Sequence, residues 1–383
     1  METLKEKIIL KGMTWDHARA VDPLIATSVK FNELHPEVEI VWEKRDLQAF
    51  ADRPLEDMAK EYDLMIIDHP HTGIASRTGL LLPFNGQGYD DELAVIAKES
   101  CGVSHKSYEF EDQQWALAID TATPVSAYRP DLLKEIPETW SQVEALAVKN
   151  KVIWPLKPIN ALMSFYNVLA NIKEPFGENG IGVNPATGVK ALELMMSVAK
   201  HLPEKCFSMD PIDAYEWLAT RSDRSYVPYL YGYTNYSRDG YRPHLINVAD
   251  VPSFANTGPI GSPVGGAGIA ISSSTKHKEL ALEYAYWIAS AECQSGIYFQ
   301  AGGQPGSKDT WTDKECNNAC NNFFLDTLKT MEGSYLRPRH DGYMEFQEIG
   351  GDLIHAYLIK GVSAEQTIEK INDEFKKSLN NEY

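Results

Sequence analysis

The sequence lacks the long apolar runs and the basic excess that mark membrane-spanning and nucleic-acid-binding proteins. No apolar run approaches the ~20 residues that a membrane-spanning helix needs. Acidic residues outnumber basic ones by 54 to 36, and the resulting net charge of −18 repels phosphate backbones and anionic headgroups. We therefore expect no nucleic-acid partner and no attachment to a membrane surface.

Cysteine is scarce as well. Five cysteines in 383 residues do not make a disulfide framework in a chain this long. Cys316 and Cys320 are four residues apart, so a helix would bring their Cα atoms to the edge of disulfide range. A metal site built on these two would lack its other ligands. Buried or free thiols are the favoured interpretation.

The common catalytic motifs are also missing. The sequence has no GxSxG, no HExxH, no P-loop and no GxGxxG leading from a strand into a helix. The stretch Asp68-His69-Pro70-His71 could be a metal cluster, but no second cluster of histidine or cysteine accompanies it. We therefore expect no enzyme activity, no cofactor and no bound metal.

What the chain does contain is enough apolar residues, 43% of the total, for two folded lobes. Apolar patterns predict strands at 7–13, 38–42 and 63–67, and a helix that opens at Asp22-Pro23. Alternating strands and helices imply a parallel sheet, whose ligands gather outside the carboxyl ends of the strands. Acids at three such ends, Asp16, Asp68 and Asp120, point to a site there.

The stretch 115–140 is the most informative part of the sequence. An apolar run at 115–119 predicts a buried strand, and Asp120, Thr121 and Thr123 follow where that strand would open into a loop. A second extended run covers 125–128, and a helix is expected to start at Trp140. This layout suits a chain that crosses from one lobe to another. An ordinary loop within a single sheet would give the same sequence pattern.

The pattern of strands and helices restarts after Trp140. A short strand is expected at 152–154, and a tyrosine-rich strand begins at 226. Helices are expected from 161, at 185–201, at 277–290 and at 363–379, with another strand at 269–271.

Four separated stretches resemble the family-1 extracellular solute-binding proteins of ABC transporters. They are YDLMIIDHP with the following GLLLPF, the stretch 115–140 ending in PETW, GGAGIAISSSTKHKELALEYAYWIAS, and AGGQPG with LRPRHDGY. No single stretch is highly specific. The resemblance rests on the order and spacing of the four stretches along nearly the whole chain. AGGQPG departs from the Gly-Gly-x-Pro-Pro that is more frequent in the family.

The resemblance implies an α/β, two-lobe fold like that of the periplasmic binding proteins, with ligand in the cleft between the lobes. Each lobe would be a mixed, mostly parallel sheet flanked by helices, one lobe at 1–123 plus 266–325 and the other at 124–265 plus 326–383. The implied function is the substrate-binding component of an ABC importer, a monomer that captures a carbohydrate, polyol or sugar acid by hinge closure and delivers it to the permease domains.

The N-terminus leaves the location open. Its apolar run, Ile8-Ile9-Leu10, is too short for the core of a signal peptide. A mature chain in the periplasm or at the cell surface and a cytoplasmic protein both remain consistent with the sequence.

Sugars present rings of hydroxyls and apolar C–H faces, which carboxylates, amides and aromatic rings recognise. Helix capping by the acids, core packing by the tyrosines and tight turns at the glycines are the structural alternatives. The candidate ligand-binding residues are Trp15, Asp16, His17, Asp68, His69, Asp120, Thr121, Tyr231, Tyr233, Asn235, Tyr236, Gly265, Gly266 and Gln304.

Three other interpretations are compatible with the same residues. Arg337, Arg339 and Lys157 could recognise an acidic sugar, although surface salt bridges would explain each of them. Two of the three acids could serve a glycosidase as proton donor and nucleophile or base. A cytoplasmic ligand sensor could keep the fold without a transporter.

Overall fold

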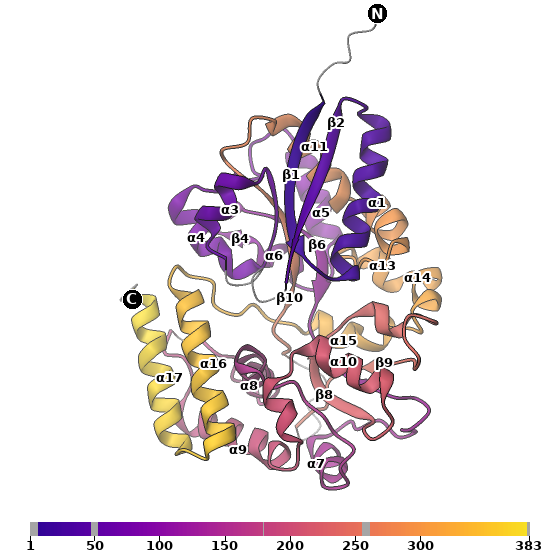
Figure 1. Ribbon diagram of the computed structural model, residues 1–383. Coiled ribbons are helices and arrows are strands. Elements are labelled where there is room, and N and C mark those ends of the chain that lie inside the picture. The colour runs from indigo at the N-terminus through magenta and orange to yellow at the C-terminus, as the bar shows by residue number, and fades with distance from the viewer. Residues whose placement is uncertain (1–6, 47–52, 179, 255–260, 381–383) are drawn as a thin grey trace, which may run out of the picture. The chain divides into compact units, whose positions relative to one another are not determined.

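The computed structural model describes residues 7–46, 53–178, 180–254 and 261–380 (Figure 1). The chain divides into two compact units, of which unit 1 comprises Met1–Thr121 and Gly265–Cys316. Unit 2 comprises Ala122–Val264 and Asn317–Tyr383. The chain therefore passes between the units three times. The last passage follows Cys316, whereas the sequence prediction put it after residue 325.

Unit 1 is organised around a five-stranded sheet in the order β2-β1-β3-β10-β6. Its strands are β1 (Ile8–Trp15), β2 (Val38–Arg45), β3 (Leu64–Ile67), β10 (Gly265–Ile271) and β6 (Leu117–Ala122). β1 runs parallel to β2 and to β3, and β10 runs antiparallel to β3. Every residue of β3 and β6 is buried, which explains why their sequences are almost continuously apolar.

Helices and one short hairpin make up the rest of unit 1. They are α1 (Ala18–Leu34), α3 (Leu55–Glu61), η1 (His69–His71), α4 (Thr72–Thr78), α5 (Asp90–Glu99), α6 (Ser104–Ser107), α11 (Lys278–Ala289), α12 (Ala291–Cys293), η4 (Gln294–Tyr298) and α13 (Lys308–Thr312), with a hairpin of β4 (Glu109–Phe110) and β5 (Gln113–Gln114). The helix α14 (Lys314–Ala319) begins in unit 1 and ends in unit 2. α1 lies beside β2, where Trp42 Nε1 donates to Ser28 Oγ at 2.9 Å (Figure 1).

The predicted start of α1 is wrong. The helix begins at Ala18, and Pro23 lies inside it rather than at its first turn. The reason is an N-cap that the sequence prediction did not consider. His17 has an extended backbone and its imidazole Nδ1 accepts from the backbone N–H of Arg19 at 3.0 Å, so the first turn forms ahead of the proline.

Unit 2 contains a three-stranded sheet in the order β8-β7-β9. β7 (Pro124–Tyr128) pairs antiparallel with both β8 (Tyr226–Tyr231) and β9 (Asn247–Ala249). The prediction of a mostly parallel sheet in each lobe is therefore wrong for unit 2. The strand expected at 152–154 reaches β8 through an isolated parallel bridge between Val152 and Tyr226. Pro155 follows at once and has no N–H with which to extend the pairing.

Helices supply most of unit 2. They are α7 (Trp140–Val148), α8 (Pro158–Asn171), α9 (Pro185–Ala199), η2 (Glu204–Ser208), α10 (Pro211–Thr220), η3 (Thr234–Ser237), η5 (Leu325–Thr327), α15 (Leu328–Glu332), α16 (Tyr343–Lys360) and α17 (Ala364–Leu379). α16 packs against both α8 and α17 (Figure 1). Across the described ranges of the chain, no helix is both long enough and apolar enough to cross a membrane.

All five cysteines are buried thiols in the structure, in agreement with the sequence interpretation. Burial raises the pKa of Cys293 in unit 1 to about 12 and the pKa of Cys206 in unit 2 to about 11. These thiols behave as small apolar side chains within the two cores.

Candidate functional site

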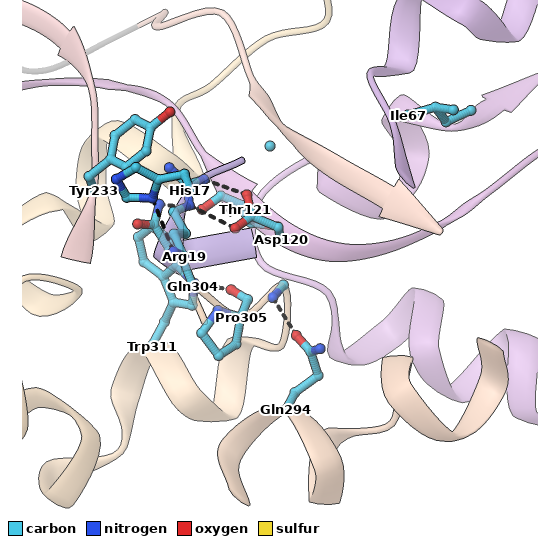
Figure 2. Close-up of polar contacts among 12 residues, drawn as sticks. His17, Arg19, Ile67, Asp120, Thr121, Tyr233, Gln294, Gln304, Pro305 and Trp311 are labelled. Atoms are coloured by element: carbon cyan, nitrogen blue, oxygen red, sulfur yellow. Dashed lines mark hydrogen bonds and ion pairs between the residues drawn. The ribbon is translucent and has the colours of Figure 1, made fainter. Parts of the chain in front are cut away.

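A buried ion pair joins α1 to β6 in unit 1 (Figure 2). Arg19 Nε donates to Asp120 Oδ2 at 2.7 Å, and Arg19 Nη2 donates to Oδ1. The two side chains are 4% and 1% exposed. Burial raises the pKa of the Asp120 carboxyl, and the Arg19 guanidinium opposes that rise. The protein itself therefore binds this carboxylate at both oxygens and compensates its charge.

This pair gives Asp120 surroundings that the sequence did not indicate. Asp120 was expected in a loop after its strand, but β6 extends to Ala122 and includes it. Asp120 also forms a bridge with Pro305. Arg19 was not among the predicted residues. Its partner is 101 residues away, and no feature of the sequence around Arg19 marks the pair.

Trp15, Asp16 and His17 form the junction between β1 and α1. Trp15 is the buried last residue of β1, and His17 caps α1. Because Nδ1 of His17 accepts a hydrogen bond, a neutral imidazole carries its proton on Nε2 and can donate from there. The Asp16 side chain is 56% exposed and pairs with Lys44 Nζ at 3.0 Å. Asp16 thus belongs to a surface ion pair.

Asp68, His69 and His71 follow directly after β3. Asp68 occupies the N-cap position of η1 but makes no capping hydrogen bond with its side chain. Both histidines are buried, and the His69 ring meets the Tyr108 ring edge-on at 6.2 Å. In the described part of the chain, no three His, Cys, Asp or Glu side chains could hold a metal ion together. Since β1 and β3 run parallel, Asp16 and Asp68 lie at the same edge of the sheet.

The loop at 301–306 runs along the end of β6 and holds Gln304. The backbone N–H of Thr121 donates to Gln304 O at 3.0 Å, and Gln304 Nε2 donates to Thr121 O at 2.8 Å. The Thr121 hydroxyl is buried and has no hydrogen-bond partner among the described residues. The structure thus brings Thr121 and Gln304, two of the predicted residues, together.

Gly265 and Gly266 begin β10, and Gly266 has a steric reason to be glycine. Its φ is +97°, and a Cβ at this position would lie 2.2 Å from Asp120 O and 2.7 Å from the Cα of Thr121. The close packing of β10 against β6 therefore explains this glycine. A tight turn does not.

Three of the predicted residues in unit 2 are buried around a tyrosine stack. Tyr233, Asn235 and Tyr236 lie in or next to η3, and Tyr236 stacks on Tyr215 with ring centroids 4.6 Å apart. The Tyr236 hydroxyl donates to Glu216 Oε1 at 2.6 Å. The ring and the hydroxyl of Tyr236 are thus both engaged inside unit 2.

The fourth of these predicted residues, Tyr231, lines a small hollow in unit 2. Polar groups there come from Asn160 and Ser164, four residues apart on α8. The complete lining is Pro124, Pro155, Asn160, Met163, Ser164, Tyr229, Leu230 and Tyr231. Apart from Tyr231, sequence reasoning missed these residues. The sequence signal that could have indicated them is the pair Asn160 and Ser164, two polar residues one turn apart near the start of a helix that follows a short strand.

The three basic residues considered for an acidic sugar do not share one environment. Arg337 is buried, and its Nη1 donates to Gln347 Oε1 at 2.6 Å and to Met163 Sδ at 3.4 Å. The interpretation of Arg337 as part of a surface salt bridge is therefore wrong. Lys157 occupies the N-cap position of α8, and Arg339 is half-buried.

Comparison with known proteins gives a consistent result. The family model described as bacterial extracellular solute-binding protein matches residues 26–319. Among solved structures, maltose-bound MalE3 of T. maritima has a TM-score of 0.84 at 19% identity, covering 96% of this chain and 99% of that one.

Two further solved structures show the same similarity. A solute-binding protein from Agrobacterium radiobacter K84 in complex with ribitol has a TM-score of 0.81 at 18% identity, covering 97% of this chain and 99% of that one. One from Thermotoga lettingae bound with α-D-tagatose has a TM-score of 0.81 at 16% identity, covering 97% of this chain and 100% of that one. The α/β class and the two-lobe fold predicted from the sequence are confirmed.

Proposed function

Because the chain belongs to the family of bacterial extracellular solute-binding proteins, we propose that it captures a carbohydrate or a polyol for an ABC importer. The family match over residues 26–319 carries this proposal. The similar structures named above hold maltose, ribitol and tagatose, which are neutral polyhydroxy compounds. We further propose that the protein acts as a monomer in the periplasm or at the cell surface and delivers its ligand to permease domains.

The hollow in unit 2 has the chemistry that such a ligand requires. The Tyr231 ring, which is partly exposed, offers an apolar face for the C–H surface of a sugar or polyol. The Asn160 amide and the Ser164 hydroxyl both donate and accept hydrogen bonds, as ligand hydroxyls do. We propose that this hollow is the ligand-binding surface of unit 2.

In unit 1 we propose that His17, Asp68, Thr121 and Gln304 provide hydrogen-bonding groups to the ligand. The buried Thr121 hydroxyl, which lacks a partner among the described residues, supports this assignment, because a buried polar group is costly when unsatisfied. The Arg19–Asp120 pair would hold β6 and the start of α1 in place beside these groups. Asp120 then supports the ligand-binding residues rather than accepting from ligand hydroxyls.

Replacing Tyr231 tests the hollow. Tyr231→Ala removes one aromatic face, and we expect the affinity for the ligand to fall by about 1–2 kcal/mol, or about 5- to 30-fold in Kd. Isothermal titration calorimetry measures the change. Tyr241→Ala is the matched control, since Tyr241 packs under Arg242 at 4.3 Å and does not line the hollow. Equal affinities for both variants and the parent chain would place the binding surface of unit 2 elsewhere.

A thermal-shift screen tests the function itself. The panel contains maltose, D-mannitol, ribitol, tagatose and two sugar acids. A ligand that binds only the folded chain raises its stability by about 2.7 kcal/mol at a hundredfold excess over Kd. We expect a neutral member of the panel to raise the melting temperature. No shift with any neutral member would contradict the proposal.

The same samples distinguish a binding protein from a glycosidase. A glycosidase needs two carboxyl groups about 5–9.5 Å apart, one as proton donor and the other as nucleophile or base. Asp120 is bound by Arg19 and Asp16 is paired with Lys44, so neither supports that role. Mass spectrometry after prolonged incubation should recover the bound compound unchanged.

The hinge closure that the family resemblance implies stays a prediction. Small-angle scattering with and without ligand tests it.

A further inference from the structure

We propose that Gln294 is a positioning residue for ligand binding: its carboxamide holds the loop at 301–306 against β6 and thereby fixes Gln304. Gln294 begins η4 and is 1% exposed. Its Oε1 accepts from the backbone N–H of Gly306 at 2.7 Å, and its Nε2 donates to Ile288 O at 2.9 Å. The first of these bonds is the dashed line that starts at Gln294 in Figure 2. One buried amide thus connects the last turn of α11 to the loop.

The loop is attached at three consecutive residues. Gln304 O accepts from the N–H of Thr121 at 3.0 Å, and Pro305 O accepts from Trp311 Nε1 at 2.9 Å. Gly306 O accepts from the N–H of Cys101 at 2.8 Å. The backbone N–H of Gly306 in turn donates to the side chain of Gln294.

The loop packs closely against its surroundings at two glycines. A Cβ on Gly306 would lie 2.9 Å from Ala118 O and 3.1 Å from Thr121 Oγ1. A Cβ on Gly303 would lie 2.3 Å from the Tyr298 ring. The loop therefore packs tightly at these two residues, and the Gln294 carboxamide satisfies the buried N–H of Gly306 beside them. Because a buried N–H that loses its acceptor is costly, removal of this carboxamide would favour displacement of the loop.

This inference rests on the proposed function, in which Gln304 and Thr121 contact the ligand. The test uses Gln294→Met, which keeps the length of the side chain and removes both hydrogen bonds. The probe is the panel compound that stabilises the parent chain most. We expect its Kd to rise about tenfold or more. The control is Gln114→Met, because Gln114 is also buried in unit 1 and its Nε2 also donates to backbone carbonyls, those of His105 and Ala116.

A second variant gives a readout that a general loss of stability would not produce. In Gln294→Glu, the ionised carboxylate still accepts from Gly306 but cannot donate to Ile288, while the protonated acid can do both. Burial raises the pKa of such a carboxyl above its ordinary value. The Kd ratio of Gln294→Glu to the parent should therefore approach one as the pH falls from 8 to 5. The ratio for Gln294→Met should stay constant.

Backbone hydrogen exchange separates this inference from the proposed function. Without ligand, Gln294→Met should reduce the protection of the Thr121 and Gly306 amides, and Gln114→Met should not. If no panel compound binds the parent, the proposed function fails and the exchange result still decides whether Gln294 holds the loop. Parent-like protection of both amides in Gln294→Met, or parent-like affinity for the probe, would overturn the inference.

Discussion

Arg19→Met should lower the free energy of unfolding by about 3–5 kcal/mol, because it leaves the Asp120 carboxylate buried without its counter-charge. Both side chains are almost completely inaccessible to solvent, so water cannot replace the lost guanidinium. The hydrophobic part of the new side chain fills similar space and keeps the packing loss small. Chemical denaturation followed by tryptophan fluorescence at pH 7 measures the difference from the parent chain.

The deficit of Arg19→Met should shrink as the pH falls. Burial already raises the pKa of Asp120, and removing Arg19 raises it further, since Arg19 opposes the rise. A carboxyl whose pKa is higher in the folded than in the unfolded chain binds more protons when folded. Its contribution to stability therefore falls as the pH rises through the folded pKa, and the loss is largest at neutral pH. A deficit that is equal at pH 5 and pH 8 would contradict this explanation.

Two further variants control the experiment. Arg19→Met combined with Asp120→Leu removes both charges and should recover much of the lost stability, because an apolar pair often replaces a buried ion pair at no cost. Lys44→Met removes the exposed partner of Asp16, and we expect a change below about 1 kcal/mol. A double variant as unstable as Arg19→Met alone would assign the effect to packing.

Gly266→Ala should destabilise the chain by about 2–5 kcal/mol. The overlap of the new Cβ with Asp120 O contributes about 1–3 kcal/mol, and a side chain at positive φ costs about 1–2 kcal/mol more. β10 would have to separate from β6 at the residues that carry Thr121. Denaturation measures the stability, and titration with the best panel compound measures a loss of affinity in the same variant.

Gly79→Ala isolates one of these two contributions. Gly79 ends α4 with a φ of +64°, and a Cβ there would meet no atom within 4 Å. We expect this variant to lose only about 1–2 kcal/mol, the cost of the backbone conformation. If Gly266→Ala were no less stable than Gly79→Ala, the packing of β10 on β6 would not require a glycine.

The parts of the fold that could be predicted are those whose signals are local. Thr139 and Gln142 form a capping box at the start of α7, and α9 begins at Pro185 as its sequence indicates. The buried β3 was visible as a continuous apolar run. The start of α1 was mispredicted because Pro23 is a strong helix-start signal, and the weaker His17 cap lies more than one turn before it.

The site was less predictable because its contacts join distant residues. Thr121 and Gln304 were both among the residues predicted from the sequence, but their mutual hydrogen bonds span 183 residues. Arg19 and Gln294 were missed because an arginine or glutamine early in a helix is usually exposed, and only the folded chain shows that each is buried. The Asp120 carboxylate was recognised as a candidate, but the spacing of residues along the sequence does not reveal that Arg19 is its partner.

The buried thiols give each unit an intrinsic reporter of its own opening. Burial raises the pKa of Cys206 to about 11 and that of Cys293 to about 12, so both remain protonated at neutral pH, whereas the thiolate is the reactive form. An alkylating reagent can therefore label them only when the surrounding core opens. The labelling rate of Cys206 then measures the opening of unit 2, and that of Cys293 measures the opening of unit 1. One chain without engineered probes thus allows the kinetic stabilities of its two cores to be compared.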